Sequence, residues 1–156
     1  MRKPLSFAFI SAMAVLASSL SAGAQDSAPE MRLTPKEIGE LKTLSGGTGT
    51  SGLAAVSTTV LYGDPSKPGL YSIELKVAPN TVIEAHTHRD TRTATVVSGM
   101  WYFGYGPKNE KDVLKMLPAG SFYTEPGGQA HFARTGAEGA RVLITGFGPS
   151  DTVFAK

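Results

Sequence analysis

The stretch that decides the fold is residues 120–131, which read GSFYTEPGGQAH. A run rich in aromatic and β-branched residues at 121–125 is followed by Pro-Gly-Gly at 126–128. Proline fixes one backbone angle and glycine accepts positive ones, so this tripeptide is typical of a tight turn. The pattern predicts a strand, a turn and a new strand that begins near His131.

The histidines are the candidate metal ligands. The chain has three of them, and the other two, His86 and His88, are two positions apart. On a strand this spacing points both rings to the same face, and a third ring from a neighbouring strand completes a three-nitrogen site. The chain has no cysteine, so any metal must be held by histidine, carboxylate or carbonyl ligands. A structural role for the histidines in the core is the alternative.

Short strands are expected over most of the remaining chain, because apolar or β-branched runs alternate with turn residues from residue 53 onward. The 18 glycines and 10 prolines favour turns, and no helical stretch separates these runs. The pattern predicts an all-β fold, an antiparallel sandwich or a single antiparallel β-barrel. The expected strands are 54–62, 70–78, 82–86, 93–105, 113–117, 121–125, 131–135 and 141–147.

One short helix is expected before the barrel. Thr34 is a suitable N-cap, Pro35 suits the first helical position, and Glu37 completes a capping box. Apolar residues follow at helical spacing, which predicts a helix over 35–44. Residues 47–52 match G-x-G-x-x-G, but a helix precedes them and a strand follows, the reverse of a dinucleotide-binding context, so a loop is expected.

The first 24 residues have the pattern of a secretory signal peptide, with Arg2 and Lys3 before a short apolar core and Ala-Gly-Ala at 22–24. Cleavage after Ala24 implies a periplasmic or secreted protein, and an uncleaved anchor is the alternative. No other segment approaches the ~20 apolar residues of a membrane span, so no stable membrane insertion is expected after cleavage. The expected organisation is a signal peptide at 1–24, a leader with the short helix at 25–50, the barrel at 51–150 and a tail at 151–156.

The basic excess of the chain belongs to this leader. The whole chain has 15 basic and 13 acidic residues. Removing Arg2 and Lys3 leaves 13 basic against 13 acidic residues, a formal net charge of zero. A nucleic-acid partner is therefore not expected, because that binding depends on excess lysine and arginine.

The stretch quoted first resembles the second motif of the cupin superfamily. That motif runs Gly, five residues, Pro-x-Gly, two residues, His, three residues, Asn. Gly120 and His131 stand at their places in it, and Thr135 replaces the final Asn. The resemblance implies a cupin jelly-roll barrel.

The first cupin motif runs Gly, five residues, His-x-His, three or four residues, Glu, six residues, Gly. His86, His88 and Gly99 are in register with it, and Asn80 replaces the first Gly. Asparagine and glycine both tolerate unusual backbone angles. Arg92 stands at the Glu position and cannot ligate a metal, because it is always protonated and offers no lone pair. The family's three-His, one-Glu site is reduced to three histidines.

Three interpretations of this site remain open. In the first, the histidines hold one divalent transition metal, Fe(II), Mn(II), Ni(II) or Zn(II), and Arg92 points away or binds an anionic substrate group. In the second, a nearby carboxylate replaces the missing Glu, either Glu84, which shares the strand parity of the first two histidines, or Glu125, which precedes the turn. In the third, Arg92 enters the cavity and weakens metal binding, which leaves a ligand-binding barrel.

The functional expectation follows from the resemblance. Some cupin dioxygenases, which act on thiols or diketones, use a three-His iron site, so a dioxygenase acting on a small anionic or dicarbonyl compound is expected, with Arg92 as anion anchor. The alternative is a non-enzymatic metal-binding, ligand-binding or sensing barrel, including one that binds carbohydrate or cell envelope through aromatics at 101–105. Whether the protein is an enzyme stays open. The resemblance also allows a homodimer. Further candidates for substrate contact or proton transfer are Glu84, Tyr102, Tyr123 and Glu125.

Overall fold

A computed structural model describes residues 29–44 and 52–155 of the chain. The predicted signal peptide, the start of the leader and most of the glycine-rich loop lie outside these residues. All the helices and strands belong to the unit that begins at Leu33. None of the described helices is long and apolar enough to cross a membrane.

The predicted helix is present but shorter than expected. Helix α1 spans Pro35–Glu40 and begins with the capping box, in which Glu37 N–H donates to Thr34 Oγ1 (3.4 Å) and Thr34 N–H donates to Glu37 Oε2 (2.7 Å). It contains no buried residue, so no tertiary packing extends it. The next residues turn extended, and Thr43–Leu44 form β1, which pairs with β2.

The all-β prediction is confirmed, and every strand pair in the sheet is antiparallel. Two expected strands, 131–135 and 141–147, are one long strand, while the expected strand at 113–117 begins later, after a short 3₁₀ helix. The predicted tail also contains a short strand, β9. The remaining elements are β2 (Val56–Tyr62), β3 (Gly69–Val77), β4 (Val82–Thr87), β5 (Arg92–Tyr105), η1 (Lys111–Val113), β6 (Lys115–Pro118), β7 (Phe122–Glu125), β8 (His131–Gly148) and β9 (Val153–Phe154).

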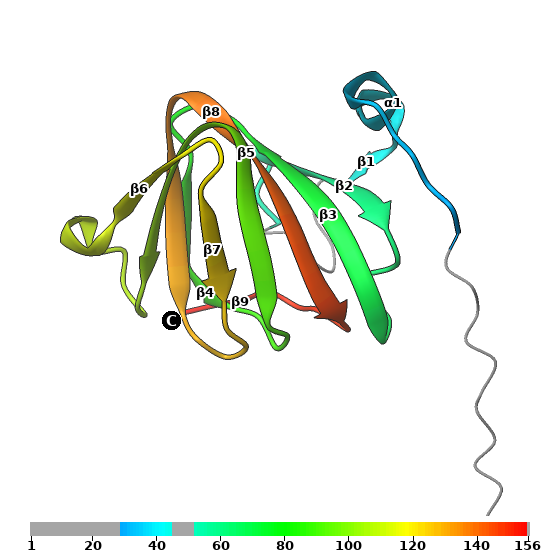
Figure 1. The fold of residues 1–156 in the computed structure, drawn as a ribbon. Helices are drawn as coiled ribbons and strands as arrows, with labels where there is room; N and C mark the ends of the chain where they lie inside the picture. The colour runs from blue at the N-terminus through cyan, green and yellow to red at the C-terminus, as the bar shows by residue number, and fades with distance from the viewer. Residues whose placement is uncertain (1–28, 45–51, 156) are drawn as a thin grey trace, which may run out of the picture. The chain divides into compact units, whose positions relative to one another are not determined.

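Strand β8 organises the barrel. Its neighbours are β3, β4 and β5, while β5 also pairs with β6 and β7. The order of neighbouring strands along the main path of the sheet is β1-β2-β3-β8-β4-β9. Figure 1 shows β8 bending over at one end, so that its two halves line different parts of the curled sheet. The first residue of β8 therefore lies beside β4, where the other two histidines are found.

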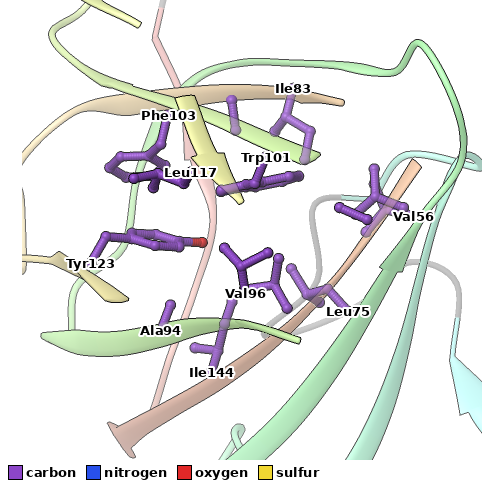
Figure 2. Close-up of a cluster of buried hydrophobic side chains, with 14 of the residues drawn as sticks. Val56, Leu75, Ile83, Ala94, Val96, Trp101, Phe103, Leu117, Tyr123 and Ile144 are labelled. Atoms are coloured by element: carbon purple, nitrogen blue, oxygen red, sulfur yellow. The ribbon is translucent and has the colours of Figure 1, made fainter. Parts of the chain in front are cut away.

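Alternating side chains of these strands fill the barrel interior (Figure 2). On β3, Tyr71, Ile73, Leu75 and Val77 are buried, while the residues that alternate with them are more exposed. Burying one such side chain stabilises the fold by about 1.5–3 kcal/mol. On β5, Trp101 and Phe103 point inward and form the apolar wall of the histidine cluster.

Two motif positions have the backbone angles that the sequence led us to expect. Asn80 has a φ of 53° and Gly99 a φ of 78°, both in the left-handed region. A Cβ at Gly99 would lie 2.2 Å from the carbonyl oxygen of Gly139, so this position of β5 excludes a side chain. Asn80 thus lies in the turn that precedes β4, whereas Gly99 lies within β5, where the pairing register with β8 shifts.

Candidate metal centre

The three histidines come together inside the barrel. His86 on β4 is the direct cross-strand neighbour of His131 at the start of β8, and His88 follows the last residue of β4. Their exposed fractions are 6%, 1% and 3% for His86, His131 and His88, respectively. Each offers one ring nitrogen, and these three atoms lie within 4.8 Å of one another. Strand β4, which carries His86 of the first motif, thus pairs with β8, which begins at His131 of the second motif.

A bulge in β4 turns its side chains. The pairing register with β8 shifts between Ile83 and His86, and Ala85 and His86 are both buried. Alternation is broken between Ala85 and His86, so His86 is buried while Glu84 stays exposed, where its carboxylate accepts a hydrogen bond from Asn109 (2.6 Å). The prediction that Glu84 shares the face of the histidines is wrong, because a β-bulge inserts one residue into the alternation.

Main-chain carbonyls orient all three rings. The Nδ1–H groups donate to the carbonyl oxygens of Glu84 (2.7 Å, from His86), Gln129 (3.0 Å, from His131) and Asp151 (from His88). A neutral imidazole that donates from Nδ1 keeps its lone pair on Nε2, and metal-binding histidines are commonly held in this way. The Nε2 atom of His131 is buried and has no hydrogen-bond partner in the described part of the chain.

Burial keeps these rings neutral. It lowers the pKa of His86 to about 4, with a further contribution from His131. It lowers the pKa of His88 to about 3, helped by the charge of Arg92, and it also lowers the pKa of His131. At neutral pH each ring therefore presents a lone pair rather than a proton to the cavity.

Arg92 points into the same cavity. It is 4% exposed, its Nε–H donates to Glu125 Oε2 (2.6 Å), and its Nη2 contacts both that oxygen and His88 Nε2. Arg92 on β5 and Glu125 on β7 are register partners. The interpretation in which Arg92 points away from the cavity does not match this geometry. The nitrogens of its guanidinium contact Glu125 and His88.

Glu125 brings a carboxylate to the histidines. Its Oε2 atom lies 3.8 Å from His88 Nε2 and 3.7 Å from His131 Nε2. Burial raises the pKa of Glu125, but the Arg92 guanidinium, together with His131 and His88, outweighs it and lowers that pKa to about 2. Glu125 is therefore an anion next to two candidate ligands, as one of the interpretations required of it.

The cavity enclosed by these groups is small, about 30 Å³. That volume corresponds to about one water molecule, whereas pockets for organic ligands measure about 300–1,000 Å³. The Nε1–H of Trp101, which lines the cavity, is buried without a hydrogen-bond partner among the described residues. The other apolar walls are Leu75, Ile83, Phe103 and Ala133.

The two tyrosine candidates lie elsewhere. Tyr102 is half-buried on the opposite face of β5 from Trp101, and the Arg134 guanidinium lies 5.8 Å from its ring centroid. Tyr123 is buried, its hydroxyl has no hydrogen-bond partner among the described residues, and burial together with nearby Glu125 raises its pKa well above the usual value. Neither tyrosine lines the 30 Å³ cavity.

The C-terminal segment contributes groups that sequence reasoning missed. The main-chain carbonyl of Asp151 orients His88, and the ring centroid of Phe154 lies 5.6 Å from that of His86. Strand β9 holds them there by pairing with β4. A carbonyl acceptor leaves no side-chain signal, so only the apolar pair Val153 and Phe154 could have indicated a strand.

The residues present fit a divalent transition metal. Three neutral imidazoles with inward lone pairs are preferred ligands of such ions, and the buried, unpaired Nε2 of His131 is explained by one. The nitrogen of His88 that a metal would use is the one that Arg92 contacts.

Comparisons with known proteins agree with this fold. No protein-family model and no curated protein matches the sequence. Among solved structures, the chain is similar to the polyketide cyclase RemF from Streptomyces resistomycificus, with 19% identity, a TM-score of 0.62, and coverage of 82% of this chain and 88% of RemF. It is also similar to an RmlC-like cupin from Shewanella frigidimarina, with 17% identity, a TM-score of 0.56, and coverage of 77% and 92%.

A third similar structure is oxalate decarboxylase from Bacillus subtilis, with 14% identity and a TM-score of 0.51. That match covers 70% of this chain but only 28% of the decarboxylase. At these identities the likeness concerns the fold and not the reaction. The resemblance seen in the two motifs is thus confirmed, and the protein has the fold of a cupin.

Proposed function

We propose that this protein is a metal-binding cupin that holds one divalent transition metal on His86, His88 and His131. The main support is the arrangement of the three buried rings. Each is oriented by a main-chain carbonyl and directs its Nε2 atom at one small cavity. When bound, the metal supplies Lewis acidity, and iron or manganese also supplies redox chemistry. The protein supplies the neutral donors, the apolar wall and the exclusion of water.

We also propose a periplasmic or secreted location. Its support is the sequence of residues 1–24, with two basic residues, a short apolar core and an Ala-x-Ala end. A site made only of histidine and carboxylate suits an oxidising compartment, because it contains no thiol to oxidise.

A dioxygenase acting on a small anionic or dicarbonyl compound is the second candidate. One observation favours it: a groove of about 480 Å³ is lined by Phe103, which also lines the metal cavity. Its volume suits a small organic molecule, and Lys115 offers a cation in it. Arg92 is less suited as the anion anchor, because Glu125 engages its guanidinium. Dioxygen uptake by the iron-loaded protein with a panel of such compounds tests this candidate, and no uptake would contradict it.

The metal proposal is tested by elemental analysis of protein purified from its native compartment. We expect about one equivalent of a single transition metal in the wild type and none in His131→Ala. Arg134→Ala is the matched control, since it truncates a neighbouring residue whose side chain lies over Tyr102 outside the cavity. A folded wild type without metal, or a His131→Ala variant with full metal content, would contradict the proposal.

A further inference from the structure

A metal bound by the three histidines would compete with Arg92 for the Nε2 atom of His88. The Nη2 group of Arg92 lies in hydrogen-bond contact with His88 Nε2, the atom whose lone pair a metal would need. That nitrogen has a single lone pair, so it accepts from the guanidinium or binds the metal, but not both. The metal-free site therefore already contains a cation, and it comes from the protein.

The same competition applies to the carboxylate. Glu125 Oε2 is held by Arg92 and lies 3.7–3.8 Å from two of the histidine nitrogens. Two atoms that bind one ion at about 2.1 Å each are at most about 4.2 Å apart, so these separations fit ligands of a common ion. Glu125 is also the only carboxylate among the described residues that line the cavity.

Asp90 offers a second hydrogen-bond acceptor for the Arg92 guanidinium. Asp90 is 8% exposed, and its Oδ2 accepts a hydrogen bond from the Tyr71 hydroxyl (2.6 Å). Its Oδ1 is buried and has no hydrogen-bond partner among the described residues. Burial lowers the pKa of Arg92, but Glu125 above all, then Tyr71 and Asp90, raise it, so Asp90 is one of the charges near the guanidinium.

We propose that Arg92 is an exchangeable internal cation: a bound metal displaces its guanidinium from His88 and Glu125 towards Asp90 Oδ1, and Glu125 becomes the fourth protein ligand. This inference rests on the proposed metal site and adds how that site is regulated. The arginine at the Glu position then makes metal affinity lower than that of the same site without it, because every binding event must break the Arg92–Glu125 pair. The carboxylate ligand is supplied by β7 instead of β5.

Zinc affinities measured by competition with a chelator test this exchange. We expect Arg92→Met to bind zinc at least tenfold more tightly than wild type, and Glu125→Gln and Asp90→Asn at least tenfold more weakly. Arg141→Met is the matched control, because it breaks an arginine–glutamate pair outside the cavity (2.7 Å to Glu74), and its affinity should not change. An Arg92→Met variant that binds no more tightly than wild type overturns the competition, and unchanged affinity in Asp90→Asn overturns the role of Asp90.

A measurement on the wild type keeps the test independent of how the variants fold. The NMR signal of the Arg92 Nε–H should move when zinc is added, while that of Arg141 should stay. If zinc binds, His131→Ala abolishes binding, and the Arg92 signal does not move, the exchange is overturned and the metal site stands. If folded wild type and folded Arg92→Met both bind no zinc, the metal site itself is overturned together with the exchange.

Discussion

Arg92 and Glu125 face each other across β5 and β7 as register partners, and each is 4% exposed. The motif that resembles cupins expects a carboxylate on β5, and here the carboxylate stands on β7 with an arginine opposite. The pair places one positive and one negative charge beside three neutral imidazoles. The charge balance of the site thus depends on two side chains that only the fold brings together.

The first prediction concerns the stability of this pair. Glu125→Gln should lower the free energy of unfolding of the metal-free protein by about 3–5 kcal/mol, because it leaves a buried guanidinium uncompensated. The double variant Arg92→Met/Glu125→Gln should recover most of that loss, since neither charge remains. Urea unfolding of the metal-free proteins measures both values. A single variant as stable as wild type would contradict the pairing seen in the structure.

Metal should stabilise the fold. Zinc at 100 times its dissociation constant is expected to add about 2.7 kcal/mol to the free energy of unfolding, which corresponds to a rise in Tm of roughly 10 °C. His131→Ala should show no rise, and a chelator should reverse that of the wild type. Calorimetry with and without zinc provides the measurement, and an equal rise in His131→Ala would point to a site elsewhere.

The C-terminal strand should be needed for tight binding. Truncation after Ser150 removes the carbonyl that orients His88 and the Phe154 ring beside His86. Loss of such an orienting partner typically costs 10–100-fold in metal affinity. We expect a folded barrel by circular dichroism with zinc affinity reduced by about that factor. Arg89→Ala, which breaks only the side-chain pair to Asp151 (2.9 Å), should have a smaller effect. Undiminished affinity in the truncated protein would remove β9 from the site.

Alkaline unfolding should depend on Tyr71. Burial raises the pKa of this tyrosine to about 12, against about 10 in the unfolded chain. Between about pH 10 and pH 12 the unfolded state holds fewer protons than the folded state, so the free energy of unfolding falls with pH, by about 3 kcal/mol in total. The stabilising contribution of Tyr71 is fully present below pH 10 and is lost as the pH rises through about 12. In Tyr71→Phe this part of the pH dependence should be missing, and an identical slope in the variant would show that another group causes it.

The two motif positions with positive φ, Asn80 and Gly99, should respond differently to alanine. Gly99→Ala must both keep a φ of 78° and place its Cβ 2.2 Å from the Gly139 carbonyl oxygen, so we expect severe destabilisation or loss of folding. Asn80→Ala has only the left-handed angle to bear, which costs about 1–2 kcal/mol for a residue with a Cβ. Asn80→Gly should be tolerated. Thermal unfolding of the three variants distinguishes these effects, and similar losses at both positions would contradict the steric argument.

The sequence predicted the barrel and the meeting of the three histidines because both depend on local patterns. Two-residue alternation marks strands, and the Gly and Pro turns fix where they end. The two motifs supplied the pairing that spacing alone leaves undetermined. Strand β8 runs on through Gly136 and Gly139, which look like turn residues, and its antiparallel partners pair with it before and after these glycines, up to Thr135 and from Ala140 onward.

The surroundings of the histidines could not be predicted in the same way. Alternation predicts Glu84 beside them, but the irregularity between Ile83 and His86 breaks the alternation, so His86 is buried and Glu84 is exposed. Local sequence does not determine the direction of the Arg92 side chain, because that direction depends on Glu125, which is 33 positions away. The carbonyl of Asp151 belongs to the backbone, so no residue type reveals it.

X-ray absorption at the zinc edge of the zinc-loaded wild type tests the metal site most directly. The account predicts three imidazole nitrogens at about 2.0–2.1 Å and a carboxylate oxygen at about 2.0–2.2 Å from the metal. Zinc bound by fewer than three imidazoles, or no zinc retained by the folded protein, would contradict it.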